Sequence, residues 1–408
     1  MSDPNSAREA TRTTLILATA QAIVGSAAPI CISLGGLAGD YLLGADKSLA
    51  TAPVTAFTVG VAAGAIPAAT IIRALGQRGG FMTGSMITGL GGGIAAIALF
   101  QMSFWMLIAG FLIIGTGGAF VQQFRFAAAD NAPAEFKAKA ISWVLAGGII
   151  TAILGPQIVI FTREMLAPVM FAGSFVSIIG LALAGMFILS FLRLRKDMPA
   201  EDDAAAGPAR PLTEIIATPK FAVGLLCAVG SYALMSFVMT GAPLAMVGCG
   251  FTTDQATLGI SWHVMAMFGP SFFTGKLIAR YGKEKIVAAG LILLIGCAVV
   301  ALSGIELWQF WTALILLGLG WNFGFIGATA MVAETYRPAE KNKVQGFHDF
   351  VLFSSVAFAS LMSGQVYNAW GWDMLNWVVF PVTVLCLVAL VGLAVVARAP
   401  AEPGGRSA

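Results

Sequence analysis

Long apolar stretches separated by short charged or turn-rich breaks constrain this chain more than any other feature of its sequence. A helix needs about 20 residues to cross a hydrocarbon core of about 30 Å, and twelve stretches are long enough. Only 11% of the residues are charged, too few to cover the surface of a water-soluble protein of 408 residues. The sequence therefore predicts an all-α membrane protein with twelve transmembrane helices. The predicted spans are 14–36, 52–72, 81–100, 104–126, 140–161, 169–192, 221–246, 256–279, 286–304, 309–332, 347–367 and 375–397.

The chain also contains an internal repeat, because one polar segment occurs in each half. Residues 129–139 and 333–343 share an alanine followed by an acid, a Pro-Ala-Glu triplet and a closing lysine, at an offset of 204 to 205 positions. Six spans per copy is an even number, so both copies enter the membrane in the same direction and form two parallel six-helix bundles. The predicted organisation is a tail (1–13), an N-terminal bundle (14–192), a linker (193–220), a C-terminal bundle (221–397) and a second tail (398–408).

The distribution of lysine and arginine predicts the orientation. Of the 23 such residues, 21 lie in alternate loops counted from the N-terminus, and only Lys47 and Arg163 lie in the other loops. Positive residues stay on the cytoplasmic side, so both termini are predicted to lie in the cytoplasm. The protein itself is predicted to span the inner (plasma) membrane. A net charge of only +3 argues against nucleic acid as a partner, and the five scattered cysteines lack metal-ligand spacing. We therefore expect a monomer in the lipid bilayer, with no metal and no cofactor.

One loop motif occurs in both halves, after the second predicted span of each. It resembles a signature of the major facilitator superfamily, which reads glycine, Asp-Arg, glycine and then basic residues. Ala279 stands at the acidic position in the second copy, and Arg73 stands there in the first. The positions that match the signature are Gly275, Arg280 and Gly282 in the second half, and Gly76 and Arg78 in the first. With the span count, the repeat and the orientation, this motif identifies the chain as similar to that family over its whole length.

This resemblance implies a secondary active transporter and not an enzyme: two bundles rock about a central cavity that binds a small organic solute. No ATP-binding P-loop is present, so a proton or other ion gradient is the expected energy source, with protons as the main expectation. Import and export both stay open. A glycine run in 147–156 resembles part of the family's antiporter motif and suggests a drug or metabolite exporter, although a tightly packed kink would also explain it. A vitamin importer, for riboflavin as an example, stays open as well, as do sugars and organic acids as substrates. A membrane sensor would need a soluble appendage, and an intramembrane enzyme would need more than two histidines.

Ionisable residues inside predicted spans are candidates for proton coupling, because they are costly in lipid. Asp349 and its neighbour His348 lie about one turn into the eleventh span, and His263 lies in the eighth. A buried acid beside an imidazole suits proton transfer. The alternatives are that His348 and Asp349 form ion pairs at the cytoplasmic gate, and that His263 is a hydrogen-bonded packing residue.

Further polar and aromatic residues are candidates for the substrate cavity, although helix packing would also explain each of them. These are Gln21, Arg125, Trp143, Gln157, Tyr232, Trp262, Trp321 and Asn322. Arg125 would attract an anionic substrate, or would extend to the membrane interface. Asp130 and Glu334 occupy matching helix ends of the two halves. We interpret them, with the basic and glycine residues of the two loop motifs, as partners in loop and gate contacts.

Overall fold

The computed structural model describes residues 4–192, 210–337 and 340–398, and every regular element in this part of the chain is a helix. The first half holds α1 (Pro4–Val24), α2 (Ala27–Leu42), α3 (Ala52–Phe100), α4 (Phe104–Val121), α5 (Phe124–Asp130), α6 (Ala134–Thr162) and α7 (Ala172–Ser190). The second half holds α8 (Leu212–Ile216), α9 (Pro219–Gly248), α10 (Thr253–Phe268), α11 (Ser271–Tyr281), α12 (Lys283–Leu302), α13 (Leu307–Ala333), α14 (Lys341–Trp377) and α15 (Val379–Arg398).

These helices make twelve membrane crossings, as predicted. Nine stretches of the described chain are long and apolar enough to cross a membrane, and two of them, 52–100 and 343–395, each hold two crossings. Another crossing is formed by α10 and α11 together, which are separated at Gly269-Pro270 and are individually too short. The first crossing begins earlier than predicted, because α1 starts at Pro4.

The glycine of the repeated loop motif has the same backbone conformation in both halves. Gly76 has φ 73° and ψ 165°, and Gly282, 206 positions later, has φ 89° and ψ 154°. A residue with a Cβ is strained at such positive φ values, whereas glycine is not. Each of these glycines turns the chain sharply between two antiparallel crossings, so the repeat seen in the sequence is also a repeat in backbone geometry.

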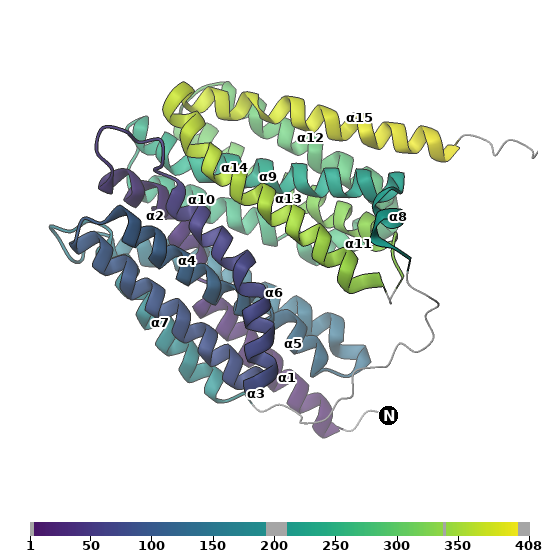
Figure 1. The fold of residues 1–408 in the computed structure, drawn as a ribbon, viewed down its shortest axis with the longest axis horizontal. Coiled ribbons are helices and arrows are strands. Elements are labelled where there is room, and N and C mark those ends of the chain that lie inside the picture. Colours follow the sequence, from purple (N-terminus) through teal and green to yellow (C-terminus); the bar gives the residue numbers. More distant parts are fainter. Residues whose placement is uncertain (1–3, 193–209, 338–339, 399–408) are drawn as a thin grey trace, which may run out of the picture.

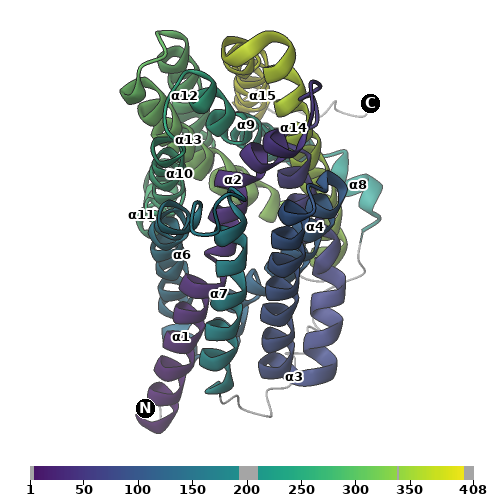
Figure 2. The same ribbon diagram turned by 90° about the vertical axis from the view of Figure 1, so that its left-hand side faces the viewer.

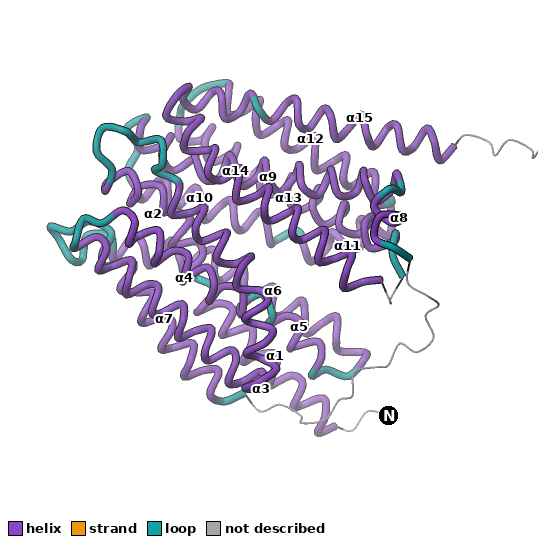
Figure 3. Tube along the Cα trace, viewed as in Figure 1, coloured by secondary structure: helices purple, strands orange, loops and turns teal. Residues whose placement is uncertain are grey.

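The two halves meet at one end of the molecule and diverge at the other (Figure 1). They touch through α6 and α10, α3 and α14, and α2 with α9 and α10. The turned view shows the same division, with the first half below the second (Figure 2). Loops gather at the end where the halves meet, and both ends of the described chain lie at the other (Figure 3). We call these the closed end and the terminal end.

Each half has its own packed core, and close helix packing depends on glycine. The larger core cluster of the second half surrounds α9 and α13, and that of the first half surrounds α2, α4 and α7. Gly155 of α6 faces Pro29 of α2, and Gly147 faces the backbone oxygen of Ala18 in α1, so closely that neither position has room for a Cβ. The glycine run of 147–156 therefore packs α6 against the first crossing. Of the predicted linker, residues 193–209 lie outside the described residues.

Candidate substrate cavity

A cavity of about 240 Å³ lies between the two halves. This is slightly below the roughly 300–1,000 Å³ that ligand pockets span. The first half contributes residues from α1 to α6, and the second contributes residues from α9, α10 and α14. Gln122 and Arg125, at the terminal end of α4–α5, line the cavity and have exposed side chains. The cavity is therefore accessible from the terminal end.

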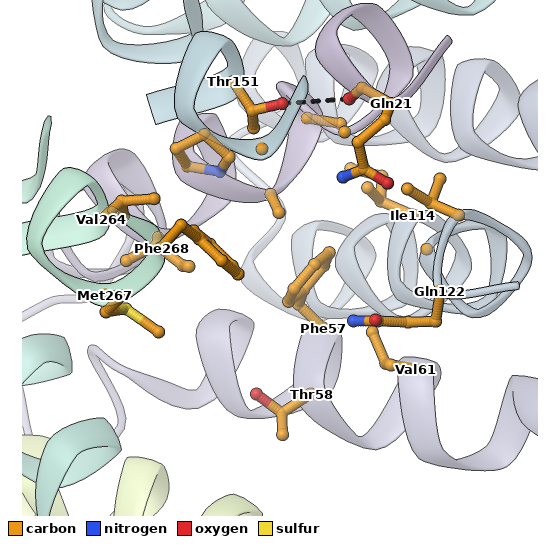
Figure 4. Close-up of a pocket in the computed structure, with 18 of the residues that line it drawn as sticks. Gln21, Phe57, Thr58, Val61, Ile114, Gln122, Thr151, Val264, Met267 and Phe268 are labelled. Atoms are coloured by element: carbon orange, nitrogen blue, oxygen red, sulfur yellow. Dashed lines mark hydrogen bonds between the residues drawn. The ribbon is translucent and has the colours of Figure 1, made fainter. Parts of the chain in front are cut away.

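The wall formed by the first half carries most of the hydrogen-bonding groups. Thr151 of α6 donates a hydrogen bond to the backbone oxygen of Gln21 at 3.0 Å, next to the break between α1 and α2. The side-chain amides of Gln21 and Gln122 both point into the cavity (Figure 4). Further polar lining residues of this wall are Thr58, Thr88 and Arg125.

The wall formed by the second half is mainly aromatic and sulfur-containing. Its rings and thioethers are those of Tyr232, Met235, Met239, Met267, Phe268 and Phe353. Tyr232 is held edge-on against three other rings, at centroid distances of 5.3 Å to Trp321, 5.0 Å to Phe325 and 6.2 Å to Phe353. Phe268 of α10 points toward Phe57 of α3 across the cavity (Figure 4). Such rings offer flat apolar surfaces for stacking.

Polar contacts between the halves close the cavity at the closed end. Arg163, which follows α6, forms an ion pair with Asp254 of α10 at 2.8 Å. On the opposite seam, Thr51 donates to the backbone oxygen of Ser360 at 3.0 Å and accepts from the backbone N–H of Gly364 at 3.2 Å. Thr51 is completely buried, so water does not reach this contact.

At the terminal end, by contrast, the ion pairs of the described residues each lie within the second half. Glu334 accepts from Lys220 at 2.6 Å and also from Lys283, and these bonds lower the pKa of its carboxyl. Arg210 pairs with the buried Glu340 at 2.8 Å, which lowers the pKa of Glu340. Because these pairs do not join the halves, they leave the cavity entrance open.

The structure brings three of the predicted cavity residues to the cavity: Gln21, Arg125 and Tyr232. Trp321 packs behind Tyr232. Asn322 is buried and bonded within the second half, where its amide donates to Met267 O at 2.6 Å and to Ser271 at 2.9 Å. It also accepts from Thr274 at 2.6 Å.

The other predicted cavity residues lie elsewhere. Trp143 packs against Phe136 and lies beneath Lys139. Trp262 is 44% exposed and is not part of the lining. Gln157 of α6 is partly buried and is not part of the lining.

The proton-coupling candidates occupy two different environments. His263 is fully buried, with Nδ1 2.8 Å from the backbone oxygen of Leu314, which matches the packing alternative. Nδ1 of the buried His348 lies 3.0 Å from Asp349, whose side chain is 60% exposed. Asp349 precedes Phe353 of the cavity lining by one helical turn, and Arg125 belongs to the lining that the first half contributes. The two opposite charges therefore both lie near the cavity entrance, Asp349 on the second half and Arg125 on the first.

The gate candidates differ between the halves. Glu334 bonds to Lys283, next to the turn at Gly282, but Asp130 is exposed and its neighbour Asn131 makes the matching contact, to Gln77 at 3.0 Å. Gln77 and Lys283 are 206 positions apart, so a neutral amide pair in the first half replaces an ion pair in the second. Arg73, Arg78 and Arg280 are exposed, and Gly275 has open space around it.

Sequence reasoning missed several residues of the site. Phe57, Phe268 and Phe353 lie among many phenylalanines of the spans, so nothing local marked them. Gln122 is an amide inside an apolar span, and this feature of the sequence could have marked it as a candidate for the cavity. The ion pair of Arg163 and Asp254 could not be foreseen, because its partners are 91 positions apart and belong to different halves.

Two parallel six-helix bundles with a cavity between them are the architecture of a large class of membrane transporters. The comparisons with known proteins agree. A family model described as Major Facilitator Superfamily matches residues 13–323 and 225–408. The chain therefore belongs to the major facilitator superfamily: it is a multi-pass membrane transporter of a small molecule and not an enzyme.

Three relatives illustrate the range of similarity. The riboflavin transporter RfnT of Brucella anthropi is 50% identical over 394 residues, which is 96% of this chain and 97% of that protein. The uncharacterized transporter YddS of Bacillus subtilis is 30% identical over 87% of this chain and 84% of its own length. The crystal structure of the nucleoside transporter NupG shares the fold, with a TM-score of 0.66, 12% identity, and coverage of 95% of this chain and 99% of that one.

Proposed function

We propose that this chain transports riboflavin into the cell. The observation that carries the proposal is the 50% identity to a riboflavin transporter over almost the whole of both chains. Among the possibilities that the sequence left open, this similarity favours the vitamin importer over the exporter.

The cavity is chemically compatible with this substrate. Riboflavin combines a flat tricyclic ring, a polar pyrimidine edge and a neutral polyhydroxyl chain. The lining supplies aromatic rings such as Tyr232 and Phe268 for the ring system, and amides such as Gln21 and Gln122 for the polar groups. A cavity whose lining holds one charged residue, Arg125, suits a substrate without net charge.

The mechanism follows from the two ends of the molecule. In the described conformation the closed end is held by Arg163–Asp254 and by Thr51 with Ser360, while the terminal end is open. We assign the terminal end to the cytoplasm, on the basis of the lysine and arginine distribution. The described conformation then faces inward, and uptake requires these contacts to open while the terminal end closes.

Asp349 is the residue we propose for proton coupling. It lies beside His348 on α14, one helical turn before Phe353 of the cavity lining, and its charge is opposite to that of Arg125 in the wall of the first half. Protonation of Asp349 would remove the attraction between Asp349 and Arg125. Closing of the terminal end would then be less favourable. Asp349→Asn should abolish riboflavin accumulation driven by a proton gradient but leave riboflavin exchange intact. Normal gradient-driven accumulation by this variant in proteoliposomes would refute the role.

The proposed substrate and direction can be tested together. A bacterial strain that cannot synthesise riboflavin should grow on micromolar riboflavin only when it expresses this chain. Proteoliposomes should take up labelled riboflavin, and excess unlabelled riboflavin should compete, whereas excess nucleoside should not. Absence of riboflavin flux in either direction would overturn the substrate, and flux only outward from expressing cells would overturn the direction.

A further inference from the structure

The two walls of the cavity differ in chemistry, and this difference coincides with the boundary between the halves. Resting on the proposed function, we propose that the second half binds the flavin ring system while Gln21 and Gln122 of the first half recognise its polar groups and determine specificity. The substrate would then bridge the two bundles, with each bundle recognising a different part of the molecule.

The two glutamines are the first argument. Both side chains line the cavity and point into it (Figure 4). Within the described part of the chain, neither side-chain amide has a hydrogen bond to protein. The bond that Thr151 donates to Gln21 ends on the backbone oxygen and not on the side chain. An amide carries two donors and an oxygen acceptor. Facing apolar rings without a protein partner, these groups are available to a ligand that presents its own donors and acceptors.

The opposite wall is the second argument. Tyr232 is fixed by the rings of Trp321 and Phe325, and Trp321 and Phe325 stack on each other at 5.3 Å with an angle of 15°. A ring held in this way presents a flat surface with little loss of side-chain entropy on binding. Met235, Met239 and Met267 add flexible, polarisable contacts. This wall favours a flat aromatic body but cannot distinguish the polar substituents that the body carries.

This division predicts how affinity responds to changes in the ligand. A site that hydrogen-bonds a polar group discriminates strongly against an analogue without it, whereas an apolar wall discriminates weakly. Loss of one such hydrogen bond should weaken binding roughly tenfold. Substitution of a glutamine should therefore reduce the difference between riboflavin and an analogue that lacks the recognised group. Substitution of a ring should weaken all flavins by a similar factor.

The test uses the purified full chain in detergent and measures binding by quenching of flavin fluorescence. The ligands are riboflavin, its N3-methyl derivative, which lacks the pyrimidine donor, and lumiflavin, which lacks the polyhydroxyl chain. The variants are Gln21→Leu, Gln122→Leu and Phe268→Leu. The control is Gln157→Leu, which changes a glutamine of α6 outside the lining. A melting curve for each variant identifies misfolded protein, and Gln122→Asn and Gln21→Asn serve as milder replacements.

The expected result is that wild-type and Gln157→Leu protein prefer riboflavin over at least one analogue by roughly tenfold. This preference should disappear in Gln21→Leu or Gln122→Leu, and Phe268→Leu should keep it while weakening all three ligands. If both glutamine variants keep the wild-type preferences, or if wild type has no preference, the inference is overturned while riboflavin binding still supports the proposed function. If wild type binds no flavin, the proposed function and this inference both fail.

Discussion

Removing the ion pair between Arg163 and Asp254 should shift the transporter toward an alternative conformation, in which the end that is closed in the described structure is open. The pair joins the two halves at 2.8 Å, and its side chains are 17% and 36% exposed. Exposed ion pairs contribute about 0.2–1 kcal/mol, and hydrogen bonds to charged groups contribute about 1.5–3 kcal/mol. A partly buried pair should lie between these values, at about 1–2 kcal/mol. Since about 1.4 kcal/mol is a factor of ten, Arg163→Gln should increase the population of the alternative conformation about 5- to 30-fold.

The assay is labelling of a cavity cysteine by a membrane-impermeant maleimide added from the closed end. Thr58→Cys places the reporter in the cavity wall. The background carries Cys249→Ser, because Cys249 is exposed and the other four cysteines are buried. In this background, Arg163→Gln should raise the labelling rate of the reporter by the same factor as the population.

The matched control is Lys47→Gln, which removes the other cation of that set of loops. Lys47 pairs with Asp40 of its own half, so its loss should leave the labelling rate unchanged. Asp254→Asn should act as Arg163→Gln does, and the double variant should add little, because both remove one interaction. Arg163 also forms an ion pair with Glu164 of its own half at 3.1 Å, so Asp254→Asn is the variant that leaves this second pair in place. Unchanged labelling in both single variants, with intact folding, would show that the ion pair of Arg163 and Asp254 does not hold the closed end shut.

Two further predictions concern residues away from the cavity. Asn322→Ala should lower the stability of the protein by about 1–3 kcal/mol, because it leaves buried partners without hydrogen bonds, and it should leave the KM for transport unchanged. A thermal melt measures the first effect and a transport assay the second. A changed KM at wild-type stability would show instead that Asn322 contacts substrate. Glu334→Gln should lower the melting temperature at neutral pH, because Lys220 and Lys283 hold the pKa of Glu334 below its usual 4.5. That contribution is complete above pH 4.5 and is lost as the pH falls through the lowered pKa. The difference from wild type should therefore narrow below about pH 4.5, and a constant difference from pH 7 to 3 would contradict this account.

The amino-acid sequence by itself determined the class, the number of crossings and the duplication. Spans about 20 residues long follow from the thickness of the bilayer, so hydropathy located all twelve. Gly76 and Gly282 marked the two turns because a positive φ requires glycine. These are local properties of the chain, and they need no knowledge of which helices pack together.

Only the tertiary structure decided which polar residues face the cavity. Gln157 and Gln21 are both amides inside apolar spans, yet only Gln21 lines the cavity. Asn322 has its hydrogen bonds within the second half instead. Which face a helix turns toward the cavity depends on its packing against neighbouring helices, including close glycine contacts. The cavity forms only between the two halves, whose matching positions are about 200 residues apart in the chain. Pairings over such distances leave no local pattern, so three-dimensional packing alone revealed them.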